Sequence, residues 1–446
     1  MMCEQDIVLC DGVRTPVGHF AKSLAAVLPE KLLEASIRDL MRRTKLDPSL
    51  VDGIVAGWVG QGSHAPNIAR IASLNAGLPL RTHAITVQCN CVSGMEAVTI
   101  AGRSLAFEEG EVFIAGGTES MSNIPYAVRG PRSHPALRSM DSLRQNWNAL
   151  WDADGVIIAD CIDEGLRDPI RHTNMAETAE ICAQRYGISR QEQDDYTIET
   201  FKRCAAAWEN GFYKSHVEPY AAPEGTIEQD EYIRLRAKLV KDPSMIRNAP
   251  YIFKRNDYPF PKFYEDFGGL IGKPYDEATC PPSVTLFNAC ARSDAAATVI
   301  VTSGRKAKEL GLTPICRLKS WAYWGYEPSQ MGVAPAFAAD VALKRGGFSF
   351  DDLDWIELHE AFAATVLSAF KVGETNFGHR WKKKWEAGRI NPNGGSIPLG
   401  HPLAATGTRL LLNLAYQMRT DTSCRLGMAA ACAAGGIGGA IVVEKV

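Results

Sequence analysis

The sequence predicts an α/β fold made of two similar halves. Strand-like and helix-like segments alternate through the first third of the chain and again through the last third, which is typical of a layered fold with a mainly parallel sheet. Each half also closes in the same way, with a turn of small residues followed by a β-branched strand, in "NACARSDAAATVIVTS" from Asn288 and in "CAAGGIGGAIVVEK" from Cys432. This repetition predicts an internal duplication.

In the first half, the spacing of apolar residues separates strands from helices. In chain order we predict a strand at 6–16, a helix at 29–44, a strand at 51–61, a helix at 67–78, a strand at 84–90, a helix at 93–110 and a strand at 111–117.

The last third repeats this alternation. We predict a strand at 314–325, a helix at 335–347, a strand running into a helix at 355–370, a helix at 400–419 and a glycine-separated pair of strands at 424–446.

The segment between the halves has a different character. It contains helical patterns at 173–187 and 190–211, followed by a run rich in Pro, Tyr and Phe at 248–269 that we interpret as irregular. Because loops of this length are usually functional or inserted, we predict a lid over the site. The predicted domains are an N-terminal half at 1–126 and 280–305, an inserted loop or lid domain at 127–279, and a C-terminal half at 306–446.

Composition limits the class of protein. The 446 residues are 46% hydrophobic and 22% charged, with a net charge of −3, which favours a large globular core and argues against nucleic acid as a partner. The N-terminus carries acidic residues where a signal peptide carries bases, and no apolar segment approaches the roughly 18 residues of a membrane span. We therefore expect a soluble cytoplasmic protein without a membrane span.

Two of the twelve cysteines, Cys89 and Cys91, lie two positions apart in "QCNCVSGMEA". They could be metal ligands, part of a disulfide framework, buried thiols, or a nucleophile and its neighbour. The cysteines are scattered and none forms C-x-x-C, which argues against metal and disulfide. Cys91 falls at the predicted turn from strand to helix, where the helix N-terminus favours an anion, so we expect a depressed pKa and a nucleophilic thiol. Cys89 is expected within the strand.

Eight segments together resemble the thiolase family, in family order and over nearly the whole chain. They are "RTPVGHF", "GQGSHAPNIARIASLNAGLP", "CVSGMEA", "IAGGTESMSNIPY", "MGVAPA", "HEAFAA", "NPNGGSIPLGHPLAATGTR" and "CAAGGIGG". The resemblance implies the thiolase fold, in which two similar halves, each with a mixed sheet between helices, form α-β-α-β-α layers beside an inserted loop domain.

The resemblance also implies catalytic roles. Cys91 is then the acylated nucleophile, His401 the base that takes its proton, and Cys432 the acid for the departing acetyl-CoA enolate. His359 and His401 are expected to bind the enolate oxyanion. Backbone N–H groups of Cys91 and Ala434 are expected to bind the oxyanion of the acyl intermediate.

Two departures from the family pattern bear on specificity. Most relatives begin the "HEAFAA" motif with asparagine, whereas His359 resembles the β subunits of trifunctional proteins, and the motif around Cys91 resembles ordinary thiolases. In "NACARSDAA", Cys290, Ala291 and Ala295 replace Ser, Gly and Gly, which puts the contacts with coenzyme A (CoA) in doubt.

Substrate and CoA contacts are expected at several positions, which are Cys290, Ala361, Phe362, Met175 and Arg234. The basic run at 234–241 is either a site for CoA phosphates or an ordinary solvated face. We expect CoA as a substrate, no permanently bound cofactor and no metal. The resemblance favours a homodimer or homotetramer and allows a complex with a hydratase/dehydrogenase subunit.

The predicted activity is CoA-dependent cleavage of 3-ketoacyl-CoA in fatty-acid or related acyl degradation. The alternatives are synthesis of acetoacetyl-CoA from two acetyl-CoA, a decarboxylating ketoacyl synthase, and a non-catalytic acyl-CoA-binding or scaffold subunit. Acyl transfer to Cys91 discriminates the last of these from the enzymes.

Overall fold

The computed structural model describes residues 5–134, 137–151, 153–253 and 258–446. Its centre is one ten-stranded sheet in the order β4, β3, β5, β10, β1, β11, β14, β13, β12, with β2 paired to β10. The strands are β1 (Ile7–Arg14), β2 (Gly18–His19), β3 (Gly53–Gly57), β4 (His83–Val87), β5 (Val112–Ser120), β10 (Ser293–Ser303), β11 (Pro314–Gly325), β12 (Trp355–Leu358), β13 (Leu426–Ala433) and β14 (Ile437–Glu444).

Strand pairing repeats between the two halves of this sheet. In the first half β1, β10 and β5 are antiparallel neighbours, and β5, β3 and β4 are parallel neighbours. In the second half β11, β14 and β13 are antiparallel neighbours, and β12 is parallel to β13. Ile390 forms a parallel bridge to Ile356 of β12, at the position that corresponds to β4 in the first half. The halves join where β1 pairs with β11.

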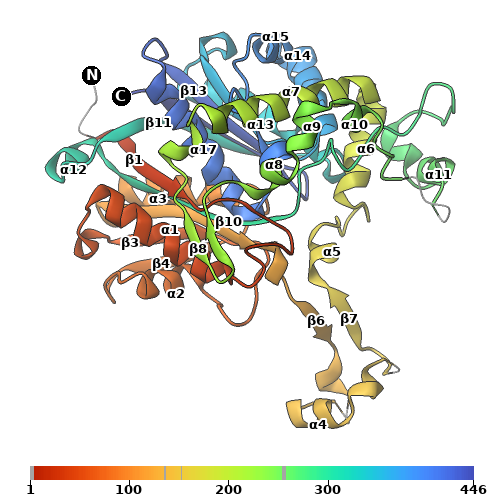
Figure 1. Cartoon of the computed structure of the whole chain (residues 1–446), viewed down its shortest axis with the longest axis horizontal. Coiled ribbons are helices and arrows are strands. Elements are labelled where there is room, and N and C mark those ends of the chain that lie inside the picture. Colours follow the sequence, from red (N-terminus) through yellow and green to blue (C-terminus); the bar gives the residue numbers. More distant parts are fainter. Residues whose placement is uncertain (1–4, 135–136, 152, 254–257) are drawn as a thin grey trace.

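Helices complete five layers, as Figure 1 shows. Helices α1 (Pro29–Thr44) and α2 (Ile68–Asn75) cover the outer face of the first half-sheet. Helix α13 (Ala334–Gly346) covers that of the second, and α14 (Ala363–Phe377) packs beside α13. Helices α3 (Ser93–Ala106) and α17 (Leu403–Thr420) lie between the half-sheets and contact each other. This arrangement confirms the predicted α/β thiolase-type architecture with a mixed sheet. The expectation of a mainly parallel sheet is wrong, because β3–β4, β3–β5 and β12–β13 pair in parallel while the other pairs of this sheet are antiparallel.

Two glycines allow the central helices to approach closely. A Cβ atom on Gly94 of α3 would lie 2.4 Å from the carbonyl oxygen of Ala404, and one on Gly407 of α17 would lie 2.6 Å from the backbone nitrogen of Met95. Any larger residue would push the helices apart. Because Cys91 immediately precedes α3 and His401 precedes α17, this close packing sets the distance between them.

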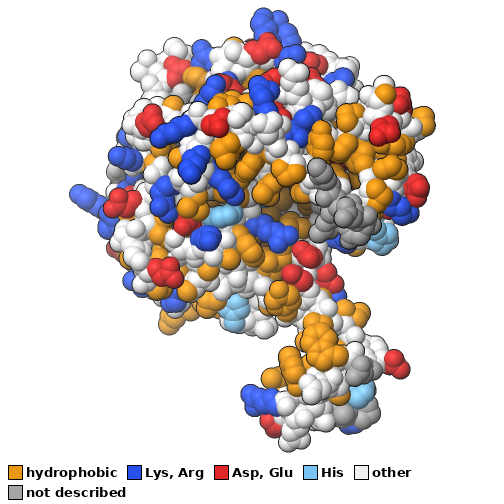
Figure 2. All heavy atoms as spheres, turned by 45° about the vertical axis from the view of Figure 1, so that its right-hand side comes forward, with side chains coloured by type: hydrophobic (Ala, Val, Ile, Leu, Met, Phe, Trp, Pro, Cys, Tyr) orange, Lys and Arg blue, Asp and Glu red, His pale blue; other side chains and the backbone are white. Residues whose placement is uncertain are grey.

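Two helices of the middle segment, which was predicted as a lid domain, pack against the second half. Helices α6 (Met175–Tyr186) and α7 (Arg190–Glu209) pack against α14, and Phe201 of α7 is fully buried. In contrast, the hairpin of β6 (Tyr126–Arg129) and β7 (Ile157–Asp160) stands clear of the main body with α4 (Met140–Gln145) at its tip (Figures 1 and 2).

The interpretation of 248–269 as irregular is wrong for its second part. Helix α11 (Phe260–Ile271) begins directly after Pro259. Phe260, Phe263 and Tyr264 share one buried face of this helix and pack together with Phe253. Burial of that aromatic face stabilises a helix despite its two glycines. Residues 254–257 of the predicted run lie outside the described residues.

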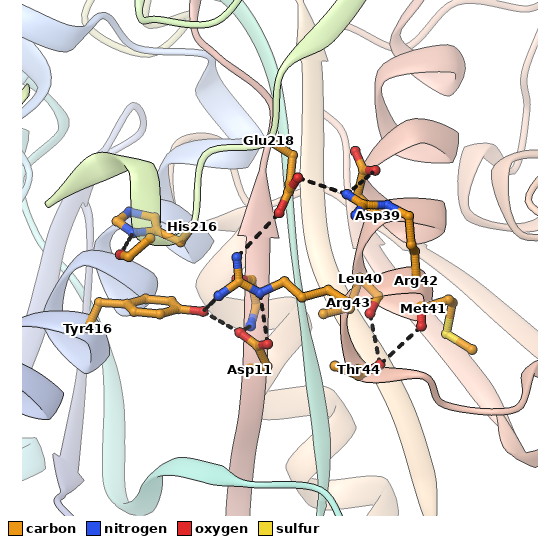
Figure 3. A network of polar contacts seen from close by, with 12 residues as sticks. Asp11, Asp39, Leu40, Met41, Arg42, Arg43, Thr44, His216, Glu218 and Tyr416 are labelled. Carbon is orange, nitrogen blue, oxygen red and sulfur yellow. Dashed lines mark hydrogen bonds and ion pairs between the residues drawn. The ribbon is translucent and has the colours of Figure 1, made fainter. Parts of the chain in front are cut away.

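A polar network fixes α17 against the first half, as Figure 3 shows. Arg43 of α1 bonds to Asp11 at 2.9 Å, to the hydroxyl of Tyr416 on α17 at 3.1 Å, and to Glu218 at 3.3 Å. The ring of His216 stacks on that of Tyr416 with centroids 4.7 Å apart. Arg43 and His216 therefore both hold Tyr416, and through it α17, the helix that follows His401. Among the described residues, no helix combines the length and apolar character needed to cross a bilayer.

Candidate active site

Cys91 lies in a tight turn between β4 and α3. Asn90 has a left-handed backbone with φ of 51°, an uncommon conformation outside glycine. The hydroxyl of Ser93 accepts from the backbone nitrogen of Cys89 at 2.8 Å and donates to the carbonyl of Asn90 at 2.6 Å, which stabilises the turn. Strand β4 ends at Val87, so the prediction that Cys89 lies within the strand is wrong, and both cysteines belong to the turn.

His401 lies against the Cys91 thiol. Its Nε2 is 3.1 Å from Sγ of Cys91, and its Nδ1 is 2.7 Å from the hydroxyl oxygen of Thr406. That hydroxyl donates to the carbonyl of Pro402 at 3.3 Å, so its lone pair is free to accept from Nδ1–H. The lone pair of His401 Nε2 then faces the thiol, which is the arrangement needed to accept its proton.

The expected depression of the Cys91 pKa is wrong for the resting protein. Burial raises the pKa of this thiol to about 12, and the charge of Glu119 adds to the effect. The backbone N–H groups of Ala434 and of Cys91 itself oppose it and do not outweigh burial. Burial, followed by the positive charge of Arg409, lowers the pKa of His401 to about 3. The resting pair is thus a neutral thiol beside a neutral imidazole.

His359 completes a close cluster with these two residues. Its ring centroid is 4.2 Å from that of His401, and the sulfur and one nitrogen from each ring all lie within 4.8 Å of one another. Nδ1 of His359 is 2.8 Å from Oγ of Ser396, which accepts from Nη2 of Arg409 at 2.6 Å. Nε2 of His359 is buried and has no hydrogen-bond partner among the described residues. Burial, His401 and Arg409 all lower the pKa of His359.

One thiol and two imidazoles resemble part of a zinc donor set. In this cluster, however, Nε2 of His401 contacts the thiol, and Nδ1 of each ring is engaged by a hydroxyl. A tetrahedral site also needs a fourth ligand or a water. The expectation that the protein holds no metal stays a prediction.

Cys432 and Ala434 approach the same sulfur from the end of β13. Cys432 is 2% exposed, and burial together with the nearby thiols of Cys91 and Cys290 raises its pKa. The N–H of Ala434 faces the sulfur of Cys91, and its carbonyl accepts from Nδ2 of Asn90 at 3.0 Å. Cys91 of the first half therefore meets His359, His401, Cys432 and Ala434 of the second.

Three of the expected substrate contacts lie in the same region. The backbone nitrogen of Cys290 donates to the carbonyl of Ala361 at 3.0 Å, and Ala289 bridges to Phe362. In the same segment, the carbonyl of Ala291 accepts from the backbone nitrogen of His401 at 2.9 Å. The altered segment at 288–297 is thus part of the wall of the site.

The other two expected contacts differ from each other. Met175, at the start of α6, packs against the apolar cluster that contains Phe362 and Cys432. Arg234 points to solvent and pairs with Glu231 at 3.6 Å. Arg236, two residues further on, lies over the rings of Tyr232 and Phe287, with its Cζ atom 5.4 and 5.5 Å from their centroids.

Buried carboxylates that our sequence interpretation missed anchor the loops of the site. Glu119 accepts from the backbone nitrogens of Gly60 at 2.9 Å and Ala404 at 3.2 Å, which ties the first half to the start of α17. Burial raises its pKa to about 7. Glu360 accepts from the hydroxyls of Tyr196 at 2.8 Å and Thr200 at 2.9 Å. For Glu360, the available signal was an acidic residue directly before the apolar residues of "HEAFAA".

Comparison with known proteins agrees with this geometry. Residues 7–242 match the family description "Thiolase, N-terminal domain" and residues 312–445 match "Thiolase, C-terminal domain". The chain belongs to the thiolase family, and its homologues identify it as an acyltransferase.

The chain is similar over its whole length to several family members. It is 34% identical to acetyl-CoA acetyltransferase of Pseudomonas aeruginosa, covering 99% of this chain and 100% of the relative, and 32% identical to that of Cupriavidus necator, covering 99% of each. Among solved structures, it is similar to human mitochondrial 3-ketoacyl-CoA thiolase in complex with CoA, with a TM-score of 0.83 at 28% identity, covering 100% of this chain and 99% of that one.

Proposed function

We propose that the protein cleaves 3-ketoacyl-CoA with CoA, through an acyl group carried on Cys91, to give acetyl-CoA and a shortened acyl-CoA. The observation that carries this proposal is the contact between Sγ of Cys91 and Nε2 of His401, with His359 and Cys432 beside it. One nucleophile, one base, one proton donor and two sets of oxyanion donors are the groups this reaction needs.

The first half-reaction breaks the carbon–carbon bond. The Cys91 sulfur attacks the keto carbon while its proton moves to Nε2 of His401. Backbone N–H groups of Cys91 and Ala434 stabilise the tetrahedral oxyanion. When the bond between the α and β carbons breaks, the electron pair enters the acetyl-CoA enolate. Its oxygen accepts hydrogen bonds from His359 and from the newly protonated His401, and the Cys432 thiol protonates the α carbon.

The second half-reaction transfers the acyl group. Acetyl-CoA leaves, and the thiol of an incoming CoA loses its proton to the Cys432 thiolate and attacks the acyl carbon. The proton on His401 returns to the departing Cys91 sulfur. Each residue is thereby restored, and the kinetics are of the ping-pong type.

Apolar side chains beside Cys91 fit the acyl substituent. Val59, Met121 and Ile124 form a cluster that contacts Cys91, and a hollow lined by Val59, Gln88 and Ile124 opens from it. For CoA, we favour Arg236 over Arg234 as the phosphate contact. Arg236 makes no ion pair with any described carboxylate, whereas Arg234 is paired with Glu231. Arg236 also lies over the ring of Phe287, three residues before Cys290.

The decisive test is intact-protein mass after incubation with acetyl-CoA, followed by a thiolysis assay over 3-ketoacyl-CoA of increasing chain length. An acetyl adduct on Cys91 excludes a scaffold role. Faster thiolysis of longer substrates supports degradation. Activity confined to acetoacetyl-CoA supports synthesis from two acetyl-CoA instead, which the names of the acetyltransferase relatives favour.

We further propose an oligomer. On the projecting β6–β7 arm, Tyr126, Trp147, Trp151 and Ile157 are each more than half exposed, which is typical of a surface that another chain covers. Strand β4 pairs only with β3 in the described part of the chain, and such an open edge is a template for pairing. Light scattering distinguishes a homodimer from a homotetramer. The cytoplasmic location, the hydratase/dehydrogenase partner and the domain boundaries stay predictions.

A further inference from the structure

A short chain of hydrogen bonds leads from Arg409 to His359. Nη2 of Arg409 donates to Oγ of Ser396 at 2.6 Å, and the same Oγ lies 2.8 Å from Nδ1 of His359. Arg409 is 1% exposed, His359 is 2% exposed, and Ser396 is fully buried. Water therefore does not replace any of these partners, and the position of each hydrogen follows from the groups themselves.

The guanidinium of Arg409 only donates, so Ser396 Oγ accepts from it. The Ser396 hydroxyl hydrogen then needs an acceptor, and Nδ1 of His359 is the one that lies within hydrogen-bond distance in the described part of the chain. If Nδ1 carried the proton instead, the serine hydrogen would be buried without an acceptor, which is unfavourable. Nδ1 of His359 is therefore the acceptor.

A neutral imidazole that accepts at Nδ1 carries its proton on Nε2. Nε2 is the atom of His359 that is buried and has no partner among the described residues, and one nitrogen of this ring lies within 4.8 Å of the Cys91 sulfur and of a nitrogen of His401. The nearby Arg409 also disfavours a second proton on the ring, so the ring stays neutral. His359 thus presents one N–H donor to the site.

We infer that Ser396, held by Arg409, is a positioning residue that fixes the proton of His359 on Nε2, so that this N–H donates directly to the enolate oxyanion of the substrate. The inference rests on the proposed thiolase reaction for its substrate, but the placement of the proton is independent of any activity. The role of Ser396 depends on His359. An asparagine at position 359 would have no ring tautomer for Ser396 to select.

The test compares Ser396→Ala with the wild type by NMR of protein labelled with ¹⁵N in histidine. Ring nitrogens that carry a proton have shifts well separated from those that do not, and a His359→Asn variant identifies the signals of His359. We expect an Nε2–H tautomer in the wild type and a mixture of tautomers in Ser396→Ala. Ser320→Ala is the matched control, because it also removes one buried serine hydrogen bond, to the carbonyl of Ala342 at 2.7 Å, far from the site.

Kinetics provide the second measurement. The interaction develops with the enolate, so Ser396→Ala should lower kcat of thiolysis about 10–100-fold with KM nearly unchanged. Acetyl transfer from acetyl-CoA to Cys91 should persist, since its oxyanion binds to backbone N–H groups. Ser320→Ala should match the wild type in both assays.

Three outcomes would overturn the inference. These are a proton on Nδ1 of His359 in the wild type, an unchanged tautomer in Ser396→Ala, and an altered tautomer without loss of kcat. Failure of the proposed function is a separate result, because a wild-type protein that forms no acyl-Cys91 still shows in its spectrum where the His359 proton lies.

Discussion

His401 places its Nε2 3.1 Å from the sulfur of Cys91, and neither group is charged in the resting protein. Burial holds the thiol protonated and the imidazole neutral at the same time. The pair therefore stores no thiolate, and nucleophilicity depends on proton transfer during attack rather than on a thiol that is already ionised.

This relationship predicts how the thiol reacts with limiting iodoacetamide. Cys91 should be modified ahead of Cys89 in the wild type, because a base contacts only Cys91. In His401→Ala the advantage should disappear, with labelling of Cys91 falling at least tenfold while labelling of Cys89 is unchanged. Peptide mapping by mass spectrometry measures both. Equal labelling of Cys91 with and without His401 would show that the helix N-terminus alone activates it.

His359→Ala should lower kcat more than it raises KM. The lost interaction belongs to the transition state, and removal of one oxyanion donor typically costs about 10²–10³ in rate. His359→Asn, which keeps a donor group, should retain more activity than His359→Ala. Steady-state thiolysis kinetics decide the matter, and an unchanged kcat with only a raised KM would make His359 a binding residue.

Cys432→Ala should separate the two half-reactions. It should still accept an acetyl group from acetyl-CoA onto Cys91, yet lose carbon–carbon cleavage and deuterium exchange at the acetyl-CoA α carbon about 10²–10⁴-fold. Cys91→Ala should abolish acylation outright. Intact-protein mass and NMR of the exchange reaction measure these effects. Normal α-proton exchange in Cys432→Ala is the outcome that contradicts the two-cysteine mechanism.

Glu357 should make stability depend on pH. Burial raises the pKa of its carboxyl from 4.5 to about 8, with Arg409 opposing, so the folded protein binds this proton more tightly than the unfolded chain. The resulting stabilisation is complete below pH 4.5 and is lost as pH rises through 8. At about 1.4 kcal/mol per pKa unit, the loss amounts to a few kcal/mol.

Glu357→Gln mimics the protonated carboxyl and should remove this dependence. Urea unfolding at pH 5 and pH 9 should show a larger loss of unfolding free energy for the wild type than for Glu357→Gln. Glu209→Gln, at the exposed end of α7, is the control that should behave as the wild type does. Parallel losses in the wild type and Glu357→Gln would mean that Glu357 ionises normally.

Arg236→Ala should raise KM for CoA several-fold at constant kcat, because a phosphate contact contributes equally to the ground and transition states. The effect should shrink at high salt. Arg234→Ala, which removes an arginine already paired with Glu231, should change KM little. Thiolysis at varied CoA concentration tests both variants. If Arg234→Ala raises KM for CoA more than Arg236→Ala does, Arg234 is the phosphate contact.

The alternation of elements was predictable because each strand and helix carries its own periodicity. Helix α1 spans the predicted 29–44, and β11 spans the predicted 314–325. Helix α11 was missed because many Pro, Tyr and Phe residues suggested an irregular run, whereas its aromatic face packs against α6 and other apolar residues that are distant in sequence. The pairing of β1 with β11, which joins the halves, could not be predicted, because neither strand's sequence pattern indicates its partner.

For the site, the sequence placed Cys91 at a turn before a helix but not its burial. A pKa depends on what surrounds the sulfur, and those surroundings include Ala434 and His401 from the other half of the chain. The support of His359 by Ser396 and Arg409 could not be predicted either, because the three residues lie in different segments that only the tertiary structure brings together. Motifs identify reacting groups, and tertiary contacts set their protonation.

The division of the site between the duplicated halves has a consequence for the gene. The sulfur of Cys91 lies in one copy, and the imidazoles of His359 and His401 and the thiol of Cys432 lie in the other. A chain cut at the exposed turn around Gly311 would give two fragments that are each chemically inert, although each contains a whole repeat. Under the proposed reaction, only reassociation of the fragments would restore turnover, so neither repeat would act as an enzyme without the other.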